Sequence, residues 1–299
     1  MTELNAEHAR RTIVDHTRRL AESAAAAGPD AVVPTAPGWT VTDLVEHVGR
    51  TQHWVAEIVE RRITDPAQLP TEMAAVPADA GRWQAWLTES AQRAASACSD
   101  AALDAPVFNA AWDGRSGTRF WLSSLLNEAV VHGFDAARAA DAEAARVADA
   151  GDAGDAGDAG DAGDAGDAAR QADRPTDIDA DVAAALIGNH LAMLTSPTWR
   201  LQRPESAHAI RGTGQTLQWL ATDIAGDAGA WLVERRPDGV AWQPRSLRAD
   251  VTVTGPARSL LLVLTRRLPL TDHHATGITV DGDADLARHW LDHTAHVSG

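Results

Sequence analysis

A repeat of Asp-Ala-Gly divides this chain into two parts. Its aspartates recur every third residue, at positions 149, 152, 155, 158, 161, 164 and 167. Glycine loses the most backbone entropy on ordering, the aspartates repel one another, and the repeat offers no large side chain to a core. We therefore expect a flexible linker over residues 142–175, between a domain of residues 1–141 and a domain of residues 176–299. A calcium-binding repeat is disfavoured, because it needs a longer motif with a large apolar residue in each turn.

Composition excludes several classes of protein. The net charge is −16, and the seven aspartates of the repeat leave −9 on the rest, which disfavours a broad nucleic-acid-binding surface but not a local arginine pocket. No apolar run has the length of a membrane span or of a signal peptide, and the single cysteine, Cys98, cannot form an internal disulfide. We expect a cytoplasmic protein, either a monomer or a homodimer, that binds neither membranes nor nucleic acids.

All 26 basic residues are arginine, and the chain has no tyrosine. Lysine and tyrosine have AT-rich codons, so their absence indicates a high-GC genome of the actinobacterial kind.

Apolar residues at helical spacing predict four helices before the linker, over residues 6–26, from Thr40 or Thr42 to about 58, 82–97 and 118–140. Thr40 and Asp43 have the spacing of a capping box, and residues 104–117 are expected to form a loop or short hairpin. Four helices of this length favour a four-helix bundle.

The pattern changes after the linker. We expect a helix over residues 179–194, strands over 217–223, 231–236, 249–255 and 277–282, and helices over 258–267 and 284–294. The predicted fold is therefore two-domain, α plus α/β, with a helical bundle followed by a smaller α+β domain.

Two of the predicted helices carry polar residues on apolar faces. Glu128 and His132 are four residues apart, so they share a face of one helix, and His47 lies on the apolar stripe of another. A carboxylate and two imidazoles from facing helices form a ligand set typical of catalytic zinc sites with an open coordination position. Two other interpretations remain open from spacing alone, because His47 could be an ordinary core histidine and Glu128–His132 a surface pair.

Other residues near these positions have two interpretations each. Trp39 and Trp54 could line a ligand pocket beside these residues or serve as packing anchors. Asp135 and Arg138 could orient the imidazole of His132 or form an ordinary surface ion pair.

The segments PGWTVTDLVEHVGRTQHWVAEIV (37–59) and LLNEAVVHGFDAARAA (125–140) resemble two diagnostic blocks of the mycothiol-dependent maleylpyruvate isomerase family, which are DinB-like metalloenzymes. The segments 212–223, 251–267 and 277–291 resemble the C-terminal domain of that family. The similarity covers most of the chain apart from the Asp-Ala-Gly repeat and its flanks.

The resemblance implies a DinB-like four-helix bundle with a divalent ion, most often zinc, on His47, Glu128 and His132, and mycothiol as the thiol that occupies the open position. It also implies a catalytic arginine from the C-terminal domain, at Arg267 or, one residue earlier, at Arg266. The family's aromatic-Gly-Arg is replaced here by Thr265-Arg266-Arg267, which leaves the substrate open.

We therefore expect a metal-dependent enzyme that activates mycothiol as a thiolate for addition to an electrophilic small molecule. The thiol either stays on the product, as in an S-transferase, or leaves again, as in maleylpyruvate cis–trans isomerisation. A non-catalytic metal-binding or regulatory module and a metal-dependent hydrolase are the other hypotheses.

Overall fold

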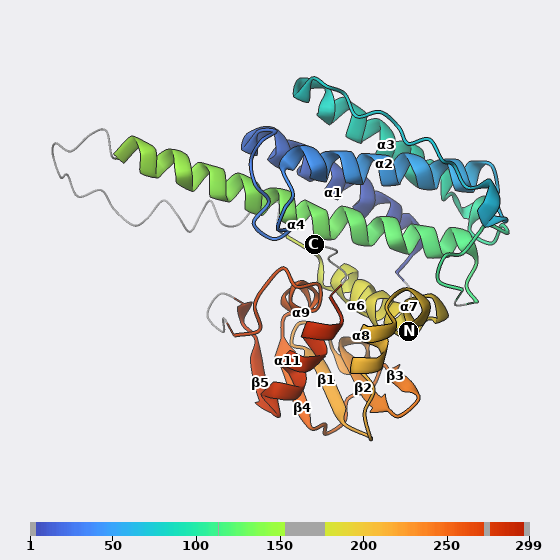
Figure 1. The fold of residues 1–299 in the computed structure, drawn as a ribbon, viewed down its shortest axis with the longest axis vertical. Coiled ribbons are helices and arrows are strands. Elements are labelled where there is room, and N and C mark those ends of the chain that lie inside the picture. The colour runs from blue at the N-terminus through green and yellow to red at the C-terminus, as the bar shows by residue number, and fades with distance from the viewer. Residues whose placement is uncertain (1–3, 113, 153–176, 272–275, 296–299) are drawn as a thin grey trace.

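The computed structural model describes residues 4–112, 114–152, 177–271 and 276–295. A helical region is followed by a smaller region built on a mixed β-sheet (Figure 1). This order confirms the expected combination of an α part and an α/β part.

The helical region contains four long helices, α1 (Ala6–Ala27), α2 (Val41–Glu60), α3 (Trp83–Ala97) and α4 (Gly117–Asp152). Helix α1 packs against α3 and α4, and α2 packs against the same two helices. The predicted capping box at the start of α2 is confirmed: the Thr40 hydroxyl accepts from the Asp43 amide at 3.3 Å, and the Asp43 carboxylate accepts from the Thr40 amide at 2.8 Å. The cap fixes where α2 begins and hence which of its residues face α4.

Helix α4 is longer than the sequence predicted. It continues to Asp152 instead of ending near residue 140, and its last residues extend beyond the neighbouring helices (Figure 1). Alanine is the strongest helix former, and Arg146 pairs with Glu143 one turn earlier on this exposed part, which accounts for the extension. The first residues assigned to the linker are thus helical, and residues 153–175 of that prediction lie outside the described residues.

The second region has a five-stranded sheet in the order β3-β2-β1-β4-β5. The strands are β1 (Thr216–Ala221), β2 (Ala230–Arg236), β3 (Gly239–Gln243), β4 (Val251–Gly255) and β5 (Thr279–Gly282). Strands β1 and β4 are parallel, with Trp219 opposite Val253, and the other neighbours are antiparallel. Four strands were predicted, whereas the edge strand β3 was missed because its residues are half-buried on both faces and show no alternation.

The helices of this region are α6 (Ala180–Leu194), α7 (Pro197–Gln202), α8 (Pro204–Ala209), α9 (Ala257–Leu264) and α11 (Ala284–His293). The short helices α7 and α8 were not predicted. Each has a proline in its first turn, where the missing amide hydrogen costs nothing.

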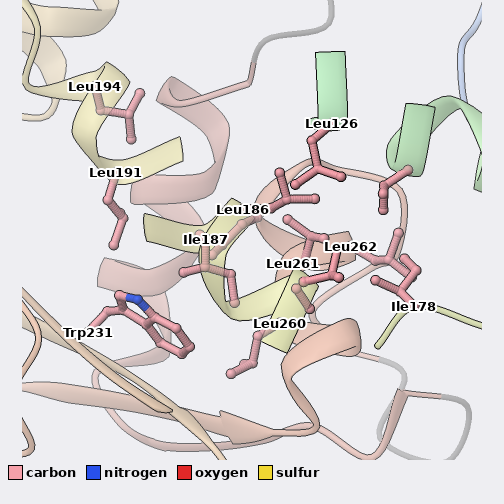
Figure 2. Close-up of a cluster of buried hydrophobic side chains, with 14 of the residues drawn as sticks. Leu126, Ile178, Leu186, Ile187, Leu191, Leu194, Trp231, Leu260, Leu261 and Leu262 are labelled. Atoms are coloured by element: carbon pink, nitrogen blue, oxygen red, sulfur yellow. The ribbon is translucent and has the colours of Figure 1, made fainter. Parts of the chain in front are cut away.

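Helices α6 and α9 lie at the packing interface between the two regions. They contact each other, α9 packs on β1 and β4, and α6 contacts both β3 and α4. Leucine and isoleucine side chains of α6 and α9 meet Leu126 of α4 in one buried cluster that also contains Trp231 of β2 (Figure 2). A continuous core of this kind holds the sheet region against α4, where the site described below lies.

Among the described residues, no helix combines the length and the apolar character that crossing a membrane requires.

Candidate metal centre

Three potential metal ligands converge where α2 meets α4. Nε2 of His47 lies 2.8 Å from Oε2 of Glu128, and Nε2 of His132 lies 3.1 Å from the same oxygen. One ligand atom from each residue can be chosen so that all lie within 4.8 Å of one another. The spacing follows from the helices: one turn of α4 separates Glu128 from His132, and the buried neighbours of His47 turn its ring toward α4.

The three side chains open into a cavity of about 400 Å³ between α2, α4 and α6. The side chain of His47 is 38% exposed, so it faces this cavity and not a sealed core. Trp39 also lines the cavity, with its indole stacked on the His132 ring at 5.7 Å between centroids and tilted against the His47 ring at 5.0 Å. An aromatic wall beside the ligands excludes water from that side.

Asp135, which is fully buried, fixes the orientation of His132. Its Oδ2 lies 2.9 Å from Nδ1 of His132, which directs Nε2 of that ring to Glu128 and the cavity. The Thr35 hydroxyl donates to Oδ1 of Asp135 at 2.6 Å. A carboxylate behind a histidine in this way sets the tautomer and rotation of a metal-binding imidazole.

Arg267 of the second region completes this network. Its Nε and Nη2 donate to the two oxygens of Asp135 at 3.1 and 2.9 Å, and Nη1 donates to the Thr265 carbonyl at 2.9 Å. Arg267 also lines the cavity. An arginine 132 residues further along the chain is thus held beside the metal ligands by its bonds to Asp135. Such a paired fork is among the strongest side-chain contacts.

The turn that delivers Arg267 ends helix α9 three residues earlier than predicted. Arg266 has a positive φ of 67°, and the Arg267 amide bonds back to the Leu262 carbonyl at 2.7 Å. This is the Schellman arrangement, in which the left-handed residue is usually glycine. The turn sends the two arginines apart: Arg266 reaches Asp292 at 3.2 Å on an exposed surface.

The charges of the site are mutually stabilised. Burial opposes ionisation of Glu128, but hydrogen bonds from His132 and His47 outweigh it and hold the pKa of Glu128 well below its usual range. Burial would lower the pKa of His132, yet the bonds to Asp135 and Glu128 raise that pKa to about 9. Burial likewise opposes ionisation of Asp135, whose pKa is nevertheless lowered to about 2 by His132 and Arg267. The carboxylates thus favour positive charge at the imidazole, as they would favour a cation.

The donor set fits a divalent ion. Two imidazole nitrogens and one carboxylate oxygen suit zinc, iron, nickel or manganese, and three protein ligands leave coordination positions for other molecules. The hydrogen bond from the His132 imidazole to the Asp135 carboxylate is of the kind that orients metal-binding histidines in such sites.

Two sequence-predicted residues lie elsewhere. The Trp54 indole N–H donates to the Pro70 carbonyl at 2.9 Å and its ring packs edge-on against Trp121, so this tryptophan is a packing anchor and does not line the cavity. Arg138 pairs with Asp141 at 3.3 Å on the exposed side of α4, which leaves Asp135 alone in the orienting role.

Two residues near the site were not assigned a role from the sequence. Thr35 lies in the loop before α2 and donates to Asp135, and His190 of α6 lines the cavity. The only sequence feature that indicated a role for His190 was the presence of a histidine within the apolar segment 180–194. A second set of potential ligands, His8, Asp179 and Asp181, is explained by the preference for acidic residues at the start of α6.

Comparison with known proteins finds a family model that matches much of the helical region. Residues 10–137 match the family described as the mycothiol maleylpyruvate isomerase N-terminal domain, and these residues include His47, Glu128, His132 and Asp135. A search of curated proteins gave no significant match.

Among solved structures, the stereoselective inverting sec-alkylsulfatase Pisa1 from Pseudomonas sp. aligns at 13% identity with a TM-score of 0.29. The alignment covers 92% of this chain but only 33% of that one, so the chain spans about a third of the length of the sulfatase. At this TM-score the two chains need not share a fold.

Proposed function

We propose a function from the premise that the chain belongs, through residues 10–137, to the mycothiol maleylpyruvate isomerase N-terminal domain family. Helices α1 to α4 are then a DinB-like four-helix bundle, and the protein is a metal-dependent, cytoplasmic enzyme that uses mycothiol. The observation that carries this proposal is the convergence of His47, Glu128 and His132 on one point of the cavity.

His47, Glu128 and His132 are the proposed ligands of one divalent ion, with zinc as the first choice. A free thiol has a pKa of roughly 8.5, and a bound dication would hold a coordinated thiol as the thiolate at neutral pH. The residues of the chain orient and shield this point. Asp135 keeps Nε2 of His132 directed into the cavity, and Trp39 covers the two imidazoles on one side.

Arg267, and not Arg266, is the arginine that we assign to the site. It lines the cavity and holds Asp135 with two hydrogen bonds, whereas Arg266 pairs with the exposed Asp292. A guanidinium in this place also adds positive charge to the cavity wall, which favours a substrate that carries a carboxylate or develops negative charge.

The proposed chemistry is the addition of the thiol sulfur to an electrophilic carbon. A C–S bond forms, and the displaced electron pair moves to the electron-withdrawing group conjugated with that carbon. If the sulfur stays, the carbanion takes up one proton, which balances the proton that the thiol lost, and the reaction is an S-transfer. If the C–S bond breaks again after rotation about the former double bond, the product is the geometric isomer, as in the maleylpyruvate isomerase for which the family is named. S-transfer is the broader proposal and isomerisation the alternative.

The test is an activity screen of the metal-loaded protein with maleylpyruvate and other electrophiles, with and without mycothiol, repeated after chelation. We expect turnover only when both metal and thiol are present. The variant Glu128→Ala should lose at least a hundredfold, whereas Glu143→Ala, on the exposed part of the same helix, should not change the rate.

Other outcomes separate the alternatives. Activity that persists without thiol would indicate a hydrolase. Metal that stabilises the fold, with no thiol-dependent turnover of any electrophile, would indicate a non-catalytic metal-binding or regulatory module.

A further inference from the structure

Helix α4 presents polar side chains to the cavity of the metal ligands that are not used inside the protein. Ser123, Ser124 and Asn127 line this cavity, and all three are half-buried. None of their side chains makes a hydrogen bond to another residue in the part of the chain that the structure describes. Polar groups of this kind in a cavity are available to a ligand and fix its orientation.

Two of these residues lie next to a proposed metal ligand. Ser124 comes one helical turn before Glu128, and Asn127 comes three residues after Ser124. Side chains three or four residues apart on a helix are neighbours, with about 5–6 Å between their Cβ atoms. A small molecule that reaches the metal ligands therefore passes within hydrogen-bonding distance of this part of α4.

The arginine of the cavity is already engaged by the protein. Nε, Nη1 and Nη2 of Arg267 each donate to a protein oxygen, and its side chain is only 7% exposed. Arg267 thus contributes positive charge to the cavity wall, while the donors of Ser124 and Asn127 remain free to contact a substrate oxygen.

The proposed reaction creates an oxygen that needs such a donor. When the thiol sulfur adds to a carbon–carbon double bond conjugated with a carbonyl group, the displaced electron pair moves to the carbonyl oxygen and an enolate forms. Phe120, Val131 and Met193 make part of the same cavity apolar. A fixed donor in an apolar surrounding stabilises a developing negative charge more than water does.

We propose that Asn127, assisted by Ser124, is a catalytic residue that donates a hydrogen bond to the substrate oxygen on which this charge develops. The carboxamide of Asn127 supplies the N–H group, and the hydroxyl of Ser124 supplies a second donor. The inference rests on the proposed function and adds to it the groups that act on the electrophile instead of the thiol.

The kinetic test compares two electrophiles in turnover by the metal-loaded protein with mycothiol. Benzylideneacetone forms an enolate when the thiol adds, whereas benzyl bromide forms none, because its C–S bond forms as bromide leaves. Asn127→Ala should lower kcat about a hundredfold for benzylideneacetone, which is the usual cost of a lost oxyanion donor. The same variant should change kcat for benzyl bromide less than twofold, and Ser124→Ala should show the same selectivity.

Two further variants control for shape and fold. Asn127→Asp has the size of asparagine but a negative charge, so its loss with benzylideneacetone should be at least as large as that of Asn127→Ala. Glu143→Ala, on the exposed part of α4, should leave both rates unchanged. Equal losses for the two electrophiles in Asn127→Ala would show that Asn127 only supports the structure of the site, and would overturn the proposal.

An infrared measurement keeps this proposal separate from the proposed function. Benzylideneacetone, isotope-labelled at its carbonyl carbon, is bound to the metal-loaded protein without thiol, so that no addition occurs. A hydrogen bond lowers the stretching frequency of a carbonyl group, so the bound carbonyl should absorb at higher frequency in Asn127→Ala than in the wild type or Glu143→Ala.

The two failures have different signatures. This frequency shift without thiol-dependent turnover would overturn the proposed function and not the contact between Asn127 and the carbonyl oxygen. Thiol-dependent turnover without the shift, or without binding of benzylideneacetone, would overturn the role of Asn127 alone.

Discussion

Asp135 has the most connections of any residue at the site. It is fully buried and contacts a proposed metal ligand, His132, an arginine of the sheet region, Arg267, and the hydroxyl of Thr35. A buried carboxylate is tolerated only when its charge is paired and its oxygens are hydrogen-bonded, and here both conditions hold. The residue therefore has two roles, in orienting an imidazole and in joining the two regions of the molecule.

The substitution Asp135→Asn tests whether these roles depend on the charge of the side chain or only on its shape. It keeps the size of the side chain but removes the charge that pairs with Arg267 and His132. We expect the affinity for zinc to fall about 10- to 100-fold and the free energy of unfolding to fall by about 3–5 kcal/mol, because a buried guanidinium loses its partner. The control is Asp141→Asn, on the exposed side of the same helix. Zinc affinity by competition titration that equals the wild type would remove Asp135 from the orienting role.

His16 of α1 predicts a pH dependence of stability. Burial, with a contribution from Arg19, lowers the pKa of His16 to about 4, although Asp15 and Asp177 oppose the shift. The unfolded chain, with a pKa near 6.5, binds this proton more readily than the folded one. The contribution of His16 to stability is thus complete above pH 6.5 and is lost as the pH falls toward 4.

The measurement for His16 is the free energy of denaturant unfolding between pH 7 and pH 4. The stability of His16→Gln should fall less steeply with decreasing pH than that of the wild type, whereas the exposed control His208→Gln should follow the wild type. Equal slopes for all three proteins would show that His16 is not held neutral by burial.

At the scale of the element, α4 shows what the sequence can predict. The spacing of Glu128 and His132 places them on one face of a helix, and that pairing needs only local geometry. The bond from Arg267 to Asp135 cannot be derived in this way. It depends on a left-handed Arg266, where glycine would be usual, and on contacts between residues 132 positions apart. The edge strand β3 was missed because its pattern has no local periodicity.

Substitution of two glycines by alanine tests how closely the helices pack. A Cβ on Gly49 of α2 would lie 2.2 Å from the Trp86 ring of α3, whereas a Cβ on Gly133 of α4 would lie 3.6 Å from His16. We expect Gly49→Ala to lower the free energy of unfolding by about 1–3 kcal/mol through overpacking. Gly133→Ala should be neutral or stabilise by up to about 1 kcal/mol, because alanine favours the helix. Thermal unfolding of both variants is the measurement, and equal effects would contradict the packing described for α2 and α3.

At the scale of the whole molecule, the two regions share one hydrophobic core and one buried ion pair. Leu126 of α4 belongs to the same buried cluster as α6 and α9, and Arg267 joins the sheet region to Asp135. The continuity of the core was not predictable from the sequence, which shows only that a repeat separates two parts. The relative placement of the regions follows from packed side chains of the described residues. We therefore propose that the chain between the regions acts only as a connector.

Deletion of residues 150–167 should therefore leave thiol-dependent activity within twofold of the wild type. Twelve residues would remain between this deletion and the start of α6, which span about 40 Å when extended. The measurement is kcat/KM of the deletion variant beside the full chain. A large loss of activity with the fold intact would show that the repeat does more than connect.

The most direct measurement of the central claim is the visible absorption spectrum of the protein loaded with cobalt(II), recorded while mycothiol is added. If His47, Glu128 and His132 bind one divalent ion with an open position, one equivalent of cobalt should give the intense visible absorption of a four- or five-coordinate cobalt ion. The thiol should then add a sulfur-to-cobalt charge-transfer band, and His47→Ala should lose both features. The claim would be contradicted if the absorption did not saturate at one cobalt ion per chain. It would also be contradicted if neither mycothiol nor His47→Ala changed the spectrum.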